Sequence, residues 1–400
     1  MSDALAGSFA DLAAQRPLLG KNTDLHSAPA PFALPMEGPD GQKYERQVSR
    51  WLARSHGRQL LRARGLHRLR PASCGFAMAH GSAGVEIFRR PDQARARVSG
   101  VCNCGQPLLC PVCSPRVAAE RSCEVGDGFN RAAARGWQAE LMVFTAPHKA
   151  GSSLLDEVDF WRSAWLKFMA CGRGSMELKK QRTGHVGGPE ITWGFLSGWH
   201  FHRNLVVYHT GNIDVEAYRR RWMDCLGGRY SKACEQFAFT SKPMDSAVMA
   251  TYCAKVGAEI AWQEGKSSSM TPLTLLVASA LAGEDCPQWV EACGVVAARK
   301  LSIVRWSKGL RADLMMSKEK TDEQLAKEKA EPTDELLGVL TPAQWHRVVA
   351  SKLEYRLTQE AQLGRENLEV FLSAHGIGEL FSHEILSGAV APVFGKQYIT

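Results

Sequence analysis

Residues 199–208, Trp-His-Phe-His-Arg-Asn-Leu-Val-Val-Tyr, decide the fold. The stretch predicts a strand, and side chains alternate along a strand, so His200 and His202 share one face while Phe201 points into the opposite layer. Two imidazoles on one face can hold a divalent cation. The plainer alternative is one exposed histidine and one histidine satisfied within the core.

The flanking segments predict further strands and helices. Residues 137–145 and 191–195 predict strands, and the second is joined to residues 199–208 by a short turn. Leu154–Ala170 has apolar residues at helical spacing, as does Ser246–Trp262.

The second predicted helix carries Tyr252 and Lys255, which share a face because they are three residues apart. A lysine beside a phenol favours the phenolate and can neutralise phosphate charge. The alternative is a tyrosine packed in the core with an exposed lysine.

Three short motifs follow one another along the chain. A strand ends in Thr145-x-x-His148, a later strand carries His200-Phe201-His202, and a helix carries Tyr252-x-x-Lys255. Their order and spacing resemble the three motifs of HUH endonucleases, and most closely those of plasmid rolling-circle replication initiators. Over about residues 100–310, further short segments are similar to sequences of that family. They are Glu190-Ile191-Thr192-Trp193-Gly194 before Gly198-Trp199-His200, Cys110-Pro111-Val112-Cys113, Thr271-Pro272-Leu273 and Trp306-Ser307-Lys308-Gly309-Leu310.

The resemblance implies an α+β fold whose ferredoxin-like HUH nuclease domain carries the histidines on a central strand of an antiparallel sheet. It implies a metal-dependent enzyme that nicks one strand of origin DNA through a covalent 5′-phosphotyrosine intermediate and rejoins strands after rolling-circle replication. Carried over by position, His200 and His202 would bind Mg²⁺ or Mn²⁺, Tyr252 would be the nucleophile, and Lys255 its electrostatic neighbour. The implied partners are plasmid origin DNA, a host helicase and a DNA polymerase.

Two positions depart from the family pattern. Asn204 stands where the family often has a third histidine, so either the two histidines bind the cation or Asn204 adds an oxygen ligand, which suits Mg²⁺ better than most transition metals. Val248 stands where some members carry a glutamate or a second tyrosine, which leaves the residue that ends replication unassigned.

Composition and charge bound the class of protein. The chain has 400 residues, 45% of them hydrophobic and 22% charged, which excludes a collagen-like or mostly disordered protein and leaves room for two domains. No apolar run is long enough for a membrane span, and the first residues lack the pattern of a secretion signal, so we expect a cytoplasmic protein.

The positive charge is concentrated in one segment. The net charge is +8, yet residues 43–100 alone hold 13 basic and three acidic side chains. Residues 46–70 predict a basic helix, and we expect Arg58, Arg62 and Arg64 to contact DNA phosphates. The alternative is a solvated basic arm.

Twelve cysteines in a chain expected to be cytoplasmic favour metal binding over disulfides. Cys102, Cys104, Cys110 and Cys113 form a cluster whose C-x2-C pair suits structural Zn²⁺. Cys102 and Cys104 are closely spaced for one zinc site, so Cys74 or Cys123 could replace one of them. The alternative is a set of packed thiols.

The expected organisation is linear. It comprises a disordered leader (1–45), a basic, cysteine-rich DNA-binding segment (46–130), the endonuclease domain (131–311), a charged linker (312–340) and a helical C-terminal region (341–400). Two other functions fit the same motifs less completely, namely a single-strand transposase of related chemistry and a non-enzymatic zinc-containing DNA-binding protein.

Overall fold

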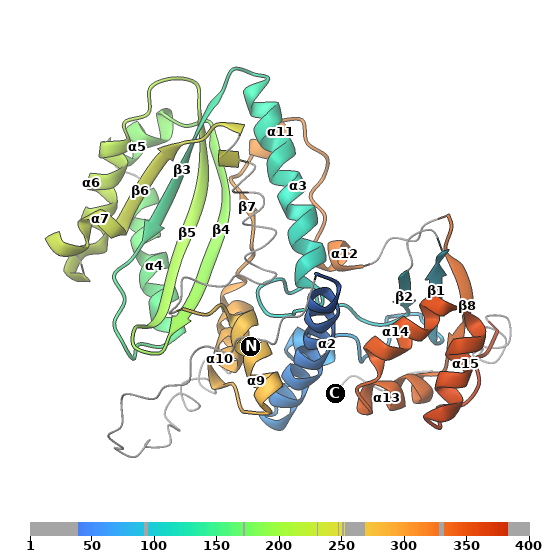
Figure 1. Ribbon diagram of the computed structural model, residues 1–400. Coiled ribbons are helices and arrows are strands. Elements are labelled where there is room, and N and C mark those ends of the chain that lie inside the picture. The colour runs from blue at the N-terminus through green and yellow to red at the C-terminus, as the bar shows by residue number, and fades with distance from the viewer. Residues whose placement is uncertain are drawn as a thin grey trace, which may run out of the picture. The chain divides into compact units, whose positions relative to one another are not determined.

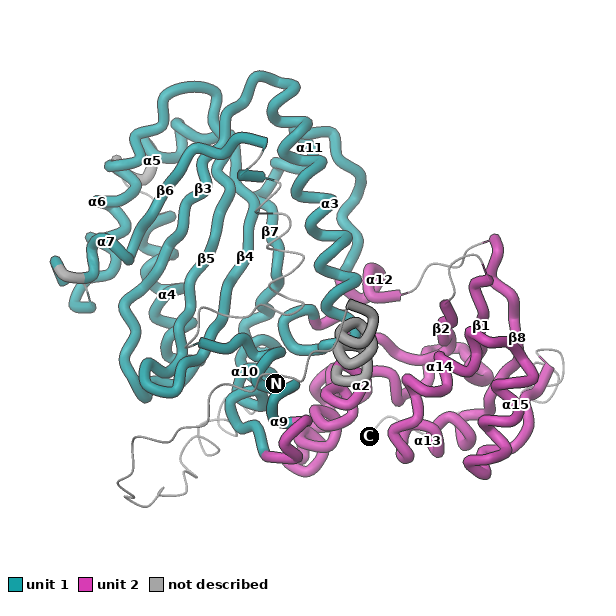
Figure 2. The backbone as a smooth tube through the Cα atoms, in the orientation of Figure 1, with its two compact units in different colours: residues 1–35, 107–279, 285–321 teal, residues 36–106, 280–284, 322–400 magenta. Residues whose placement is uncertain are grey.

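The computed structural model describes the chain in separate stretches. They are residues 39–91, 95–170, 173–229, 231–246, 248–249, 252, 269–327 and 332–382. These stretches form two compact units (Figure 2), and each combines helices with antiparallel strands, which confirms the α+β fold class. Of the expected leader, residues 1–38 lie outside the described residues, whereas residues 39–45 are helical. No helix in the described stretches is long and apolar enough to cross a membrane.

Unit 1, residues 1–35, 107–279 and 285–321, is built on a five-stranded sheet (Figure 1). The strand order is β6-β3-β5-β4-β7, and every neighbouring pair is antiparallel. The strands are β3 Gln138–Thr145, β4 Gly184–Gly194, β5 Gly198–His209, β6 Phe239–Pro243 and β7 Arg305–Trp306. The strand predicted at residues 199–208 is therefore β5, and it lies at the centre of the sheet as expected.

Strand β4 begins seven residues before the predicted Ile191. Its first half contains three glycines and a proline, which weaken a strand prediction. In the structure these glycines allow a close approach, because a Cβ at Gly188 would lie 1.7 Å from the carbonyl oxygen of Ile303.

One face of this sheet is covered by α4 (Leu154–Met169) and α6 (Val215–Leu226). Phe144 of β3 packs edge-on against Trp165, Phe168 and Trp222 of these helices, with ring centroids 5.3–5.4 Å apart. The helix predicted at residues 154–170 is confirmed as α4. The remaining helices of this unit are α3 Ser114–Ala133, α5 Arg173–Lys180, η3 Gly227–Arg229, η4 Lys232–Cys234, α7 Glu235–Ala238, α9 Pro272–Ala282 (ending in unit 2), α10 Pro287–Arg299 and α11 Leu310–Asp313.

Unit 2, residues 36–106, 280–284 and 322–400, has a three-stranded antiparallel sheet in the order β2-β1-β8. Its elements are α2 Pro39–Ala63, η1 Arg70–Ser73, β1 Val85–Arg90, β2 Arg95–Ser99, α12 Asp322–Ala326, β8 Glu335–Leu340, α13 Pro342–Ala350, α14 Glu354–Leu363 and α15 Arg365–Ala374. The unit therefore combines segments from both ends of the chain, whereas we expected them to follow one another as separate regions.

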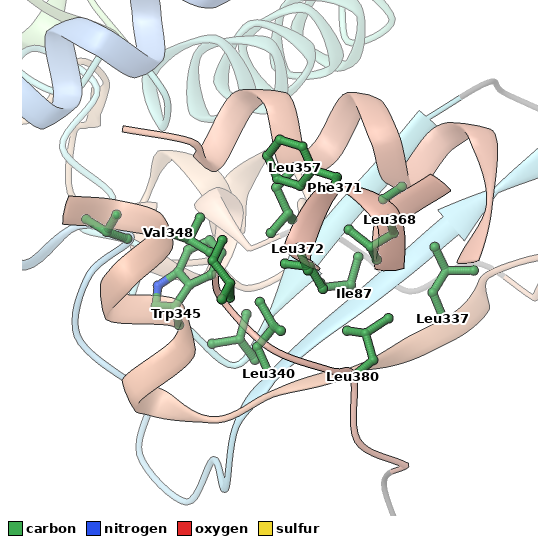
Figure 3. Close-up of a cluster of buried hydrophobic side chains, with 14 residues drawn as sticks. Ile87, Leu337, Leu340, Trp345, Val348, Leu357, Leu368, Phe371, Leu372 and Leu380 are labelled. Carbon is green, nitrogen blue, oxygen red and sulfur yellow. The ribbon is translucent and has the colours of Figure 1, made fainter. Parts of the chain in front are cut away.

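The core of unit 2 explains this combination (Figure 3). Ile87 of β1 packs with Leu337 of β8, Trp345 of α13 and Leu357 of α14, and all four side chains are at most 2% exposed. Strand β8 lies at the end of the expected charged linker, and without it β1 would lose one of its two sheet neighbours. The C-terminal region, expected to be helical, forms three helices within residues 342–374.

Candidate active site and cysteine metal centre

The two predicted histidine ligands lie on β5, which pairs with β3 on one side and β4 on the other. The register sets His202 opposite Thr145 of β3 and Glu190 of β4, and sets His200 opposite Thr192. Directly opposed residues share a face of the sheet, so these polar side chains gather on one face.

Glu190 connects the predicted ligands. Its Oε2 atom lies 2.9 Å from Nε2 of His202 and accepts a hydrogen bond of 3.1 Å from Nδ2 of Asn204. The Asn204 amide nitrogen therefore points at this carboxylate. Glu190 begins one of the segments that resemble the family, but the sequence alone assigns it no role. Only the β4–β5 register sets Glu190 opposite His202.

A third imidazole belongs to the same group. The ring centroids of His148 and His200 are 4.9 Å apart, and those of His200 and His202 are 5.0 Å apart. The pKa of His200 is lowered to about 4, mainly by burial and also by the neighbouring imidazoles of His202 and His148, against the raising effect of Glu190. His200 is therefore neutral at pH 7, which is the protonation state that a metal ligand needs.

This group provides an incomplete set of ligand atoms for a divalent cation. Nδ1 of His202 is buried without a hydrogen-bond partner, although Nε2 of the same ring faces Glu190. Within the described residues, no three ligand atoms of His148, His200, His202 and Glu190 all lie within 4.8 Å of one another. An open set with few protein ligands suits Mg²⁺, which keeps waters and takes substrate phosphate oxygens as further ligands.

Tyr252 is described as a helical residue that is 7% exposed, whereas Lys255 and most of the predicted helix 246–262 lie outside the described residues. The phenol interacts electrostatically with Arg203 of β5. The pKa of Arg203 is lowered to about 10, mainly by burial and also by Arg305 and Arg162, while Tyr252 has a raising effect. A guanidinium with this pKa is still charged at pH 7, so it places a positive charge near Tyr252.

The basic helix predicted in residues 46–70 corresponds to α2, which begins earlier and ends at Ala63, and Arg58 of this helix does not face solvent. Arg54 and Arg58 each place a guanidinium nitrogen 2.9 Å from Oε1 of Glu354, and all three side chains are at most 4% exposed. Burial lowers the pKa of Arg58, against the raising effect of Glu354. The charge of Arg58 is therefore neutralised by Glu354 inside unit 2, and its contact with DNA stays a prediction.

The other two predicted DNA contacts differ in exposure. Arg62 is exposed, with its guanidinium 4.2 Å from the ring centroid of Phe76 and its Nε donating to the carbonyl of Ala72. Arg64 is half-buried and donates to the carbonyl of Leu60. Of the predicted trio, Arg62 is the one with the most surface available to a phosphate.

Four buried cysteines form a candidate metal centre. The Sγ atoms of Cys74, Cys104, Cys110 and Cys113 all lie within 4.8 Å of one another, and each residue is at most 4% exposed. Zn–S bonds of about 2.3 Å in a tetrahedron place sulfurs about 3.8 Å apart, so small side-chain rotations suffice to close this set on one ion. Four thiolates are a typical ligand set for structural zinc, and the cluster could hold such a metal.

The structure changes one member of the predicted cluster. Cys102 lies outside it, since its Sγ donates to the carbonyl of Met78 at 3.2 Å and burial raises the pKa of its thiol. Cys74 takes its place, as one of the sequence alternatives allowed, whereas Cys123 is exposed and lies outside the cluster. Arg58 supports this centre, because its Nη1 donates to the Cys74 carbonyl at 2.8 Å.

Comparison with known proteins finds likeness over part of the chain. No family model matches it, and no solved structure matches it. The chain is 29% identical over 164 residues to "Neomycin resistance protein" of Streptomyces cyanogenus, covering 35% of this chain and 37% of that protein. It is 27% identical over 173 residues to "Protein rep" of Streptomyces lividans, covering 36% of each. The chain thus spans just over a third of the length of these curated relatives.

Proposed function

We propose that this protein is a plasmid replication initiator that nicks one strand of origin DNA and rejoins strands after rolling-circle replication. The observation that carries the proposal is the group of His200, His202 and Glu190 on the neighbouring strands β5 and β4, together with His148 from the segment after β3. Partial likeness to a protein named for replication supports the same function. The assignment to the HUH class and the proposed nuclease chemistry rest on the sequence motifs.

In this proposal His200 and His202 hold Mg²⁺ or Mn²⁺, which would offset the charge of the scissile phosphate and orient it. Glu190 fixes the ring of His202 by accepting its Nε2–H and leaves Nδ1 for the cation. Asn204, whose amide nitrogen donates to Glu190, fixes the carboxylate rather than adding an oxygen ligand. His148 extends the row of imidazoles at the end of β3.

Tyr252 is the proposed nucleophile and Lys255 its neighbouring cation. The phenol oxygen forms a bond to phosphorus while the bond from phosphorus to O3′ breaks, so the 5′ phosphate becomes joined to tyrosine and a 3′ hydroxyl is released. That hydroxyl can prime a DNA polymerase on a strand opened by a host helicase. The phosphotyrosine conserves the energy of the broken bond, so a later 3′ hydroxyl can rejoin the strands without ATP.

The test uses supercoiled plasmid carrying the origin, with Mg²⁺ or Mn²⁺, and detects nicked circles and a protein-linked 5′ end. Tyr252→Phe should abolish both products and leave DNA binding nearly unchanged, because only a hydroxyl is lost. Tyr355→Phe is the matched control, since Tyr355 is also 7% exposed. The Tyr355→Phe protein should nick DNA normally. His202→Ala should raise the Mn²⁺ concentration needed for cleavage. A Tyr252→Phe protein that nicks as well as the parent overturns the assignment.

The cysteine cluster favours a second candidate, a zinc-containing protein that binds DNA without cutting it. In that case no covalent product forms with any variant, and removal of zinc abolishes DNA binding. A related single-strand transposase would instead join the strand it cuts to a second, unlinked DNA molecule.

A further inference from the structure

The turn between β4 and β5 exposes two large apolar side chains. Phe195 is 84% exposed and Leu196 is 82% exposed, which are the highest values among the large hydrophobic residues in the described part of the chain. A pair of apolar side chains held in water at a hairpin tip gives no stability to the fold. The pair therefore points to a binding role.

The tip is held firmly by its neighbours. The rings of Trp193 and Phe195 meet edge to face at 6.3 Å, and the backbone of Trp193 is paired both with Trp199 and with Met270. Gly198 closes the turn with a φ of +72°, a conformation that favours glycine. Phe195 is thus presented on a paired hairpin rather than on a free loop.

The tip lies at the same end of the sheet as the histidine group. His200 is two residues after Gly198 on β5, so about 7 Å of strand separates the end of the turn from His200. The segment after His148 lies beside the turn, since a Cβ at Gly198 would be 3.2 Å from the Gly151 nitrogen and 3.8 Å from the Lys149 oxygen. Lys149 is exposed there and supplies a positive charge.

We infer that Phe195 and Leu196 bind the unpaired bases next to the phosphate held at the histidine group, an inference that rests on the proposed function. An unpaired strand offers apolar base faces that an aromatic side chain can stack on, whereas a duplex has already stacked its bases on one another. Lys149 provides charge for the phosphates of the same strand. The tip thereby selects single-stranded DNA at the cleavage site.

The experiment compares two 20-nucleotide strands, dT20 and an abasic strand that keeps the phosphates and lacks the bases, by fluorescence anisotropy. Phe195→Ala should weaken binding of dT20 about tenfold, the size of one lost base–aromatic stack, and leave binding of the abasic strand unchanged. Phe195→Trp should restore dT20 binding. Phe237→Ala is the matched control, because Phe237 is 68% exposed in the same unit and should have no effect.

Three outcomes overturn the inference. The first is unchanged dT20 binding by Phe195→Ala, and the second is an equal loss for both strands. The third is a change in sedimentation of the unliganded variant, which would make the tip a contact between copies of the chain. The Tyr252→Phe protein separates this inference from the proposed function, since it should bind dT20 normally and lose only the covalent product.

Discussion

The cysteine centre gives the sharpest prediction, because the sequence and the structure favour different fourth ligands. We expect Cys74→Ser to release zinc and Cys102→Ser to retain it. The reason is geometric, since the Cys74 sulfur lies within 4.8 Å of the other three and the Cys102 sulfur is hydrogen-bonded to the Met78 carbonyl instead.

The size of the effect follows from the number of ligands. Binding of structural zinc by four-ligand peptides is worth about 10–16 kcal/mol, so an equal share for one ligand is about 3 kcal/mol. This corresponds to a loss of about a hundredfold in zinc affinity for Cys74→Ser. Cys102→Ser should leave the affinity within about twofold of the parent, since no zinc bond is lost.

The assay is competition for zinc against a chromophoric chelator, with bound zinc measured independently by elemental analysis. Chelation should also lower the midpoint of thermal unfolding of the parent and of Cys102→Ser, because a metal that binds only the folded state stabilises it. Zinc loss by Cys102→Ser with retention by Cys74→Ser would refute the reasoning. Equal zinc content in all three proteins would show that these cysteines are packed thiols.

Three further predictions concern charge. Glu354→Gln leaves two buried guanidinium groups without a carboxylate and should lower the free energy of unfolding by about 3–5 kcal/mol in urea titrations, whereas the exposed Glu366→Gln should change it by less than about 0.5 kcal/mol. Arg62→Gln should reduce the slope of log binding constant against log salt by about one, while Arg58→Gln should lower stability and leave the slope unchanged. Burial lowers the pKa of His185 from 6.5 to about 3, so between these pH values the imidazole is protonated in the unfolded state and neutral in the folded state. The free energy of unfolding should therefore fall by about 4 kcal/mol as the pH drops from 6.5 toward 3. His185→Gln should flatten that pH dependence in acid-unfolding curves.

Much of unit 1 could be predicted from the sequence because its signals are local. The strand at residues 199–208 and the helix at 154–170 were predicted within one or two residues, since alternation and helical spacing reflect the geometry of a single element. The common face of His200 and His202 follows from the same alternation. The start of β4 could not be predicted, because its glycines are explained only by a neighbouring segment that packs against them.

Long-range contacts decided what the sequence left open. Arg54 and Glu354 are 300 positions apart, and their pairing turns part of an apparently DNA-binding surface into the interior of unit 2. The choice of Cys74 over Cys102 depends in the same way on a distant segment that folds back.

The sequence by itself determined the strand that carries the histidines, the shared face of those side chains and the presence of a group of cysteines that could hold a metal. The tertiary structure alone decided that Glu190 opposes His202, that Cys74 completes the cysteine centre and that β8 completes the small sheet. The physical reason is range. Steric preferences act between residues a few positions apart, whereas register and burial depend on which remote segments meet in the folded chain.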